Sequence, residues 1–325
     1  MNTKKRSLLL GLTASTLIAS AALAQTTVWT GGHDGDRFNQ GANWSNGVPE
    51  AGWTATVTDA RVEIGTAGEM NTGATVNFNG TALLERNSIA QSQFSGTLNI
   101  NDQSNVNISY WIVGEGATLN WNSSGTFGRS PAGPSGQTRL LIDRDAPNAV
   151  VNVYSGFWNL TGNTHMDSIQ IDNGIFNMYG GLLIADNRFK VGRGDRVGIV
   201  NYYADAEIRA AGMGTFFDSQ FRFQPNATLY LETGLLGSFG TEGFEWFRDE
   251  MRKGADSAIY IMGVGQQSLT ETQSWTDNPF FVYDTVELDG IWYNSMTAIP
   301  EPRVYAAFFG LLALAFAAYA RRRRA

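Results

Sequence analysis

The sequence predicts an all-β fold: a single right-handed parallel β-helix, that is, a solenoid of stacked coils, with a cap at each end. Short β-rich units recur along the middle of the chain, each with an asparagine at its third position. The units alternate apolar and polar residues, and they are too short and too β-branched for helices. Glycines flank many of them, as expected at sharp corners. The units are Thr75–Phe78, Thr97–Ile100, Thr118–Trp121, Val150–Val153, Ile175–Met178 and Ile199–Tyr202.

The spacing of the asparagines indicates the length of one coil. Steps of 22, 21, 32, 25 and 24 residues separate Asn77, Asn99, Asn120, Asn152, Asn177 and Asn201. The step of 32 contains a Pro/Gly-rich insertion, Gly128–Gly136. Stacked in register, the coils would bury their apolar side chains against one another, and the asparagines would form an amide ladder. Gly156 and Gly181 are expected at corners. A β-sandwich, which also has many short strands, is the alternative.

The repeats are similar to autotransporter-associated β-helix repeats, and the predicted domain boundaries follow from them. Residues 25–57 form an amino-terminal cap, 58–237 the repeats and 238–298 a carboxyl-terminal cap. The first cap carries Trp29-Thr30-Gly31-Gly32 and Asn43-Trp44-Ser45, and it resembles the opening of many bacterial β-helical adhesins and autotransporter passengers. In the second cap we expect a helix over Thr241–Gly254 and strands over Ala258–Gly263 and Phe280–Trp292.

Composition excludes several classes of function. The 325 residues include no cysteine and two histidines, so thiol chemistry, a disulfide scaffold and a multi-histidine metal centre are excluded. The first 24 residues carry a formal charge of +3 and the tail from Pro300 carries +4, so the body between them carries −14 against −7 for the whole chain. Such a body is unsuited to nucleic acid. No cofactor or metal site is predicted, and His33-Asp34-Gly35-Asp36 is interpreted as a turn rather than a calcium loop.

The amino terminus has the pattern of a secretory signal peptide over residues 1–24. Lys4-Lys5-Arg6 is the positive region, Ser7–Ser20 the apolar region, and Ala22-Leu23-Ala24 the small-residue cleavage pattern. We therefore expect export through the secretion translocon, with signal peptidase cutting between Ala24 and Gln25. An uncleaved anchor is the alternative.

The carboxyl terminus, residues 299–325, combines three features. A Pro-Glu-Pro motif precedes an apolar stretch, Val304–Ala320, long enough for about 25 Å of helix and so near the lower limit for a membrane span. A basic cluster follows, which by the positive-inside rule would stay in the cytoplasm. The motif is Pro300, Glu301 and Pro302, and the cluster is Arg321, Arg322, Arg323 and Arg324.

This arrangement resembles the PEP-CTERM sorting signal of Gram-negative bacteria. The resemblance implies that an exosortase, an integral-membrane cysteine enzyme, recognises Pro300–Pro302, that Val304–Ala320 is a transient membrane anchor, and that the four arginines retain it. It covers only about 26 residues, and an ordinary tail anchor is the alternative.

The densest charged stretch is a candidate ligand patch: Asp186, Arg188, Lys190, Arg193, Asp195 and Arg196. Alternation would place Asp186, Arg188 and Lys190 on one outward strand face, where they could bind an acidic sugar; a solvated face is the other interpretation. No catalytic residue is assigned. No catalytic motif surrounds the other candidate residues, which are the pair Asp143 and Asp145, the acids Glu245, Asp249 and Glu250 of the expected helix, and the lone His165.

The tryptophans at 44, 53, 111, 121 and 158 could stack on sugars if exposed, but most are expected in the core or a cap. Together these features predict an exported cell-surface or extracellular-matrix protein of a Gram-negative bacterium, non-enzymatic and structural or adhesive. Extracellular polysaccharide is the expected partner. The alternative is a polysaccharide lyase or glycosidase on the same scaffold.

Overall fold

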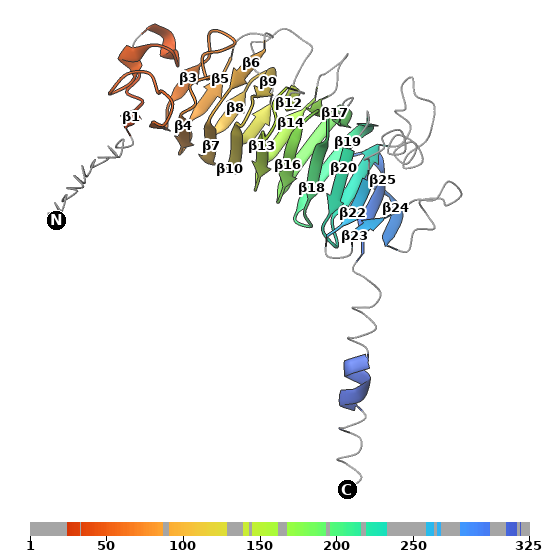
Figure 1. Ribbon diagram of the computed structural model, residues 1–325. Helices are drawn as coiled ribbons and strands as arrows, with labels where there is room; N and C mark the ends of the chain where they lie inside the picture. The colour runs from red at the N-terminus through yellow and green to blue at the C-terminus, as the bar shows by residue number, and fades with distance from the viewer. Residues whose placement is uncertain are drawn as a thin grey trace, which may run out of the picture.

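The computed structural model describes residues 25–32, 34–86, 91–128, 139–142, 145–161, 168–192, 196–215, 219–232, 258–262, 265–267, 280–299, 310–316 and 319. Within these residues the chain forms an all-β solenoid of about seven turns. Figure 1 shows it as an elongated stack of strands, with the amino-terminal loops at one end and β24 and β25 at the other.

One side of the solenoid is a sheet of mainly parallel strands, which we call the first sheet. Its last strand, β23 (Gly265–Gln267), is antiparallel to β22. The parallel strands, in spatial order, are β1 (Thr26–Val28), β2 (Thr54–Thr58), β4 (Thr75–Asn79), β7 (Thr97–Asp102), β10 (Thr118–Ser123), β13 (Val150–Val153), β16 (Gly174–Met178), β18 (Gly198–Tyr202), β20 (Ser219–Phe223) and β22 (Ala258–Ile261).

The second sheet forms the other two sides of each coil. One side consists of β3 (Arg61–Glu63), β5 (Leu83–Glu85), β8 (Asn105–Asn107), β11 (Thr126–Gly128), β14 (Phe157–Leu160), β17 (Gly181–Val191), β19 (Ala206–Thr215) and β21 (Thr228–Glu232). The third side consists of β6 (Ser92–Phe94), β9 (Tyr110–Val113), β12 (Arg139–Ile142) and β15 (Ile169–Ile171), which join the sheet through the second half of β17.

All of these coil-to-coil pairings are parallel, which confirms the predicted β-solenoid and not the antiparallel β-sandwich. The register follows the repeated asparagines: Asn99 pairs with Asn77 on one side and Asn120 on the other. Along β4 the burial alternates, with Val76 and Phe78 inside. The spacing read from the sequence is therefore the spacing of the coils.

Corners close tightly where glycine was expected. Gly156 has φ +88° and Gly181 has φ +86°, a region that disfavours other residues. A Cβ at Gly156 would lie 2.3 Å from the carbonyl oxygen of Ser123, one coil away. Glycine at this corner thus permits both the turn and the close approach of neighbouring coils.

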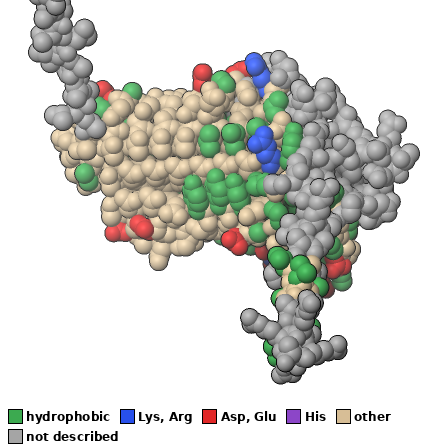
Figure 2. All heavy atoms as spheres, turned by 60° about the horizontal axis from the view of Figure 1, so that its bottom comes forward, with side chains coloured by type: hydrophobic (Ala, Val, Ile, Leu, Met, Phe, Trp, Pro, Cys, Tyr) green, Lys and Arg blue, Asp and Glu red, His purple; other side chains and the backbone are tan. Residues whose placement is uncertain are grey.

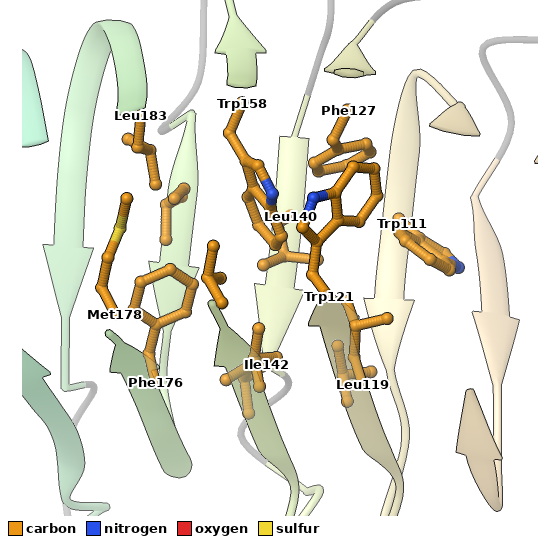
Figure 3. Packing of buried hydrophobic residues seen from close by; sticks show 14 of the residues in the cluster. Trp111, Leu119, Trp121, Phe127, Leu140, Ile142, Trp158, Phe176, Met178 and Leu183 are labelled. Carbon is orange, nitrogen blue, oxygen red and sulfur yellow. The ribbon is translucent and has the colours of Figure 1, made fainter. Parts of the chain in front are cut away.

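The core is a column of aromatic and aliphatic side chains inside the coils (Figure 3). Trp158 lies at its centre and contacts Trp121, Phe127 and Phe176, with ring centroids 5.4, 4.9 and 6.0 Å away. Trp111, Trp121 and Trp158 are fully buried, as expected of core residues. They are therefore unavailable for stacking on sugars.

The amino-terminal segment packs a smaller aromatic group against the first coils. Trp44 lies between Trp29 and Phe38, with ring centroids 4.9 and 5.3 Å away, and its Nε1 donates to the Phe38 carbonyl oxygen at 2.8 Å. Trp53 is partly buried against the same core. Asp34–Asp36 forms one 3-10 turn, as predicted. A second turn of this kind spans Gly41–Asn43.

The carboxyl-terminal end differs from the prediction of a strand over Phe280–Trp292. The chain instead forms an antiparallel hairpin of β24 (Phe281–Leu288) and β25 (Ile291–Ala298), with β25 pairing antiparallel to β21. Asp289 and Gly290 make the turn with φ of +53° and +81°. A two-residue Asp-Gly loop is a strong hairpin signal, so the sequence contained the information.

Two other predictions fall mainly outside the described residues. The helix expected over Thr241–Gly254 lies entirely outside them. Of the expected anchor, residues 310–316 are helical and exposed, and among the described residues no helix is long and apolar enough to cross a membrane.

Candidate functional site

The outward side chains of the first sheet form regular columns along the stack, and we call this surface the ladder face. Strands stacked in register place equivalent side chains at the strand spacing of about 4.8 Å. The first column begins with five threonines and continues with three aliphatic residues: Thr26, Thr54, Thr75, Thr97, Thr118, Val150, Ile175 and Ile199. The second is the asparagine column, and the third ends in Tyr154, Tyr179 and Tyr203.

The asparagine column is a continuous hydrogen-bonded ladder, as predicted. Each Nδ2 donates to the Oδ1 of the asparagine in the preceding coil, at 2.6–2.8 Å. At the amino-terminal end, Nδ2 of Asn77 donates to the Ala55 carbonyl oxygen at 3.2 Å. Each amide uses one donor and one acceptor in the ladder and keeps one of each. The members are Asn77, Asn99, Asn120, Asn152, Asn177 and Asn201.

The tyrosines of the third column stack on one another. The rings of Tyr154 and Tyr179 are nearly parallel, with centroids 4.9 Å apart, and those of Tyr179 and Tyr203 are 4.4 Å apart. Tyr154, the first in the row, is 45% exposed. Because their faces are covered by each other, these tyrosines present ring edges and hydroxyls rather than a stacking platform.

Figure 2 shows this surface directly: two short rows of hydrophobic side chains run along the stack and are separated by a row without them. A cation follows at the carboxyl-terminal side. In register, Arg222 comes next after Asn201, and its guanidinium lies 5.6 Å from the Tyr260 ring and donates to Gln220 at 2.8 Å. The columns named above contain no carboxylate.

The predicted ligand patch is divided by the structure. A register shift in β17 lies between Ala185 and Arg188. Asp186, before it, is exposed, whereas Lys190, after it, is 9% exposed and pairs in register with Gln170 on the third side. Lys190 is therefore not the solvated charge that alternation suggested.

The other members of the patch give little further evidence. Arg196 is exposed. The side chain of Arg188, and all of Arg193 and Asp195, lie outside the described part of the chain.

Next to Lys190, the third side carries a buried polar group that sequence reasoning missed. Arg139 lies over the Tyr110 ring at 5.1 Å and donates to Oε1 of Gln170. Gln170 in turn donates to both carboxylate oxygens of Asp172 at 2.6 Å, and Asp172 is fully buried. Gln170 and Asp172 are two positions apart in the sequence, but Arg139 is 31 positions from Gln170, and the coil register brings Tyr110, Arg139 and Gln170 together.

A second missed cluster lies on the second sheet, towards the hairpin. Arg209 contacts Glu207 and, at 2.5 Å, Asp289 of the hairpin turn. Burial raises the pKa of the nearby Glu232 carboxyl, and the negative charge of Asp186 raises it further. Tyr293 lies among these charges, and burial raises its pKa. We call Asp186, Glu207, Arg209, Glu232, Asp289 and Tyr293 the carboxylate cluster.

A third charged group lies at the amino-terminal end of the second sheet. Nε of Arg61 donates to Glu85 at 2.6 Å, and its guanidinium is 3.9 Å from both Glu63 and Asp36. These acids are paired with a cation, and among the described residues no group of three or more His, Asp or Glu side chains has an arrangement that could hold a metal ion.

Several predicted site residues lie outside the described residues: Ala24, Asp143, His165, Glu245, Asp249, Glu250, Pro300, Glu301, Pro302, Arg321, Arg322, Arg323 and Arg324. Gln25 and Asp145 are described and exposed. The sorting motif and the signal-peptide cleavage site therefore remain predictions.

No protein-family model, curated protein or solved structure matches this chain. The fold and the sites described above accordingly rest on the structure of the chain itself.

Proposed function

We propose that the chain is an exported bacterial cell-surface or extracellular-matrix protein whose right-handed parallel β-helix is a non-enzymatic display scaffold. In this proposal the signal peptide directs the chain to the translocon, and an exosortase acts at the carboxyl-terminal motif. The support is the signal pattern of residues 1–24 and the three-part tail of residues 299–325.

The ladder face is the observation that favours display over catalysis. Its asparagines bond one another, its tyrosines stack on one another, and its columns lack carboxylates. A general acid or base needs a titrating group close to the reacting atoms, and threonine, asparagine and stacked tyrosine do not provide one near neutral pH. A rigid, repetitive and neutral surface is suited to binding.

Replacing Pro300-Glu301-Pro302 with three alanines tests the sorting step. We expect the variant to remain in the inner membrane with its tail uncut, because the enzyme loses its recognition element. Cell fractionation and the size of the chain on a denaturing gel measure this. Three alanines at Glu271-Thr272-Gln273 are the control, which also removes one acid. Normal size and surface location of the motif variant would refute exosortase sorting.

A carbohydrate-active enzyme is the second candidate, and the carboxylate cluster favours it. Glu232, with its raised pKa, and Asp186 are two carboxylates on strands two coils apart, flanked by a cation and a tyrosine. A carboxyl of raised pKa next to an ionised one is the pairing that glycoside hydrolysis uses.

Assays on polysaccharides distinguish the two candidates. The full-length protein is incubated with uronic-acid polymers and with neutral glycans, and unsaturated products and new reducing ends are measured. The display proposal predicts neither. Product that disappears in Glu232→Gln and persists in the exposed-site control Glu287→Gln would establish the enzyme instead.

A further inference from the structure

The central part of the ladder face differs from the rest, and we call it the tyrosine strip. It spans β13, β16 and β18, where the asparagine column runs between an aliphatic row, Val150, Ile175 and Ile199, and the row Tyr154, Tyr179 and Tyr203. Figure 2 shows two short rows of hydrophobic side chains on the visible face. Towards the amino terminus, threonines replace the aliphatic row and asparagines replace the tyrosine row.

The strip offers a matched set of contacts for hydroxyl groups. Asn152 and Asn201 are part-buried and each keeps one N–H and one acceptor site for a hydroxyl, which both donates and accepts, whereas Asn177 between them is buried and serves to hold the ladder in register. Along one edge the hydroxyls of Tyr179 and Tyr203 hydrogen-bond each other and Tyr154 is exposed, so this edge still offers hydroxyl groups to a ligand. The aliphatic row along the other edge can contact C–H surface. A ligand with hydroxyls on one side and C–H groups on another, as in a pyranose ring, fits all three.

Charge restricts the ligand further. The strip has no charged side chain, so it offers no ion-pair partner to a charged polymer. The body of the protein carries a formal charge of −14, which repels polyanions. The cation next to it, Arg222, is already engaged by Gln220 and Tyr260. These charges disfavour uronic-acid polymers as the ligand and favour uncharged polysaccharides.

The aliphatic and tyrosine contacts recur in all three coils of the strip at the strand spacing of about 4.8 Å, and part-buried asparagines lie between them in the first and third coils. A ligand with repeating units gains from every row, whereas a single sugar would use only one. We propose that the tyrosine strip binds an uncharged, unbranched polysaccharide that lies along the axis of the solenoid. This inference rests on the proposed display function and specifies its ligand.

The test compares binding by full-length protein, in a detergent without a sugar headgroup, to three probes: hydroxyethyl cellulose and mannan, which are neutral, and polygalacturonate, which is acidic. Affinity electrophoresis measures retardation by each polymer. Two variants introduce the same charge in the same column: Ile199→Glu inside the strip and Thr75→Glu outside it. Circular dichroism melting establishes that both are folded.

We expect at least one neutral polymer to retard the wild-type protein and Thr75→Glu, and Ile199→Glu to bind it about tenfold more weakly or worse, since a carboxylate against an apolar ligand surface is costly. Polygalacturonate should cause no retardation. Binding of polygalacturonate alone, binding unaffected in Ile199→Glu, or no binding to either neutral polymer would overturn the inference. So would a dimer, seen by sedimentation velocity, that only Ile199→Glu abolishes.

Failure here is separable from failure of the proposed function. A protein that reaches the cell surface but binds no neutral polymer refutes the ligand and leaves display intact. A protein that stays in the inner membrane refutes display, whatever the purified chain binds.

Discussion

Asn120 shows how one side chain links three coils. Its amide donates to Asn99 and accepts from Asn152, both at 2.8 Å, and all three are part-buried. Hydrogen bonds arranged in a chain polarise one another, so an interior member supports more than its own two contacts. The ladder is therefore expected to depend more on its middle than on its end.

Replacement of Asn120 by leucine tests this dependence. Two hydrogen bonds are lost, because Oδ1 of Asn99 loses its donor and Nδ2 of Asn152 loses its acceptor, so the free energy of unfolding should fall by about 1–3 kcal/mol. Asn201→Leu, at the end of the ladder, breaks one ladder bond and should cost about 1 kcal/mol. Urea unfolding of both variants measures the difference. Equal losses would show that the middle of the ladder contributes no more to stability than its end.

Glu232 gives a pH dependence with a defined sign. Its pKa is raised above 4.5 by burial and by Asp186. An acid with a higher pKa in the folded chain than in the unfolded chain holds its proton more tightly when folded, so folding stability falls as the pH rises from 4.5 through the raised value. Glu232→Gln should therefore increase the free energy of unfolding at neutral pH and leave it unchanged well below pH 4.5.

Urea unfolding at the two pH values measures this, with Glu287→Gln, at an exposed position of β24, as the control. An identical effect of Glu232→Gln at both pH values would mean that ionisation of Glu232 is not the cause.

At the scale of the element, the corners determine how closely coils stack. Gly156 and Gly52 have similar φ values, +88° and +81°, but different surroundings. A Cβ at Gly156 would meet the Ser123 oxygen at 2.3 Å, whereas nothing lies within 4 Å of one at Gly52. The pair therefore separates backbone strain from close packing between coils.

Gly52→Ala should cost about 1 kcal/mol, the strain of a left-handed alanine, and Gly156→Ala about 3 kcal/mol or more, because a neighbouring coil must also move. Thermal unfolding followed by circular dichroism gives both values. If the two variants melt alike, the corner does not limit coil spacing.

The elements also show what the sequence could predict. Six first-sheet strands were identifiable because each carries a ladder asparagine, a signal repeated in the sequence itself. They are β4, β7, β10, β13, β16 and β18, whereas β1, β2, β20 and β22 lack this asparagine. β6, β8 and β15 have three residues each and no residue type common to all three, so the sequence gives no repeated signal that locates them. The β24–β25 hairpin was missed although Asp289-Gly290 marks it. The carboxylate cluster was not predictable, because coil stacking brings Asp186 near Glu232 and the hairpin turn brings Asp289 to Arg209.

At the scale of the whole molecule, stacked coils make the protein modular. Each coil packs mainly on its two neighbours, so the core is continuous but every contact is nearly local along the axis. Stability is then roughly a sum over coils. Removal of one complete coil should leave a shorter stack that still folds.

Deletion of Thr97–Ala117 removes one coil and joins Gly96 to Thr118, a residue that already pairs with Thr97. We expect a folded protein with cooperative but weaker thermal unfolding. Deletion of Thr97–Asn107 removes part of a coil, brings the wrong side chains inwards and should prevent folding. Circular dichroism and size-exclusion chromatography distinguish the outcomes. If the complete-coil deletion also fails to fold, the coils are not interchangeable units.

The amide ladder gives the stack an electrical direction. Every asparagine donates towards the amino-terminal end, so the six amide dipoles point the same way and add together. The oxygen-rich end faces the carboxyl terminus, where Arg222 provides positive charge one strand beyond Asn201. Two such rods meeting end to end would attract each other head to tail and repel head to head, so any filament that they build should be polar.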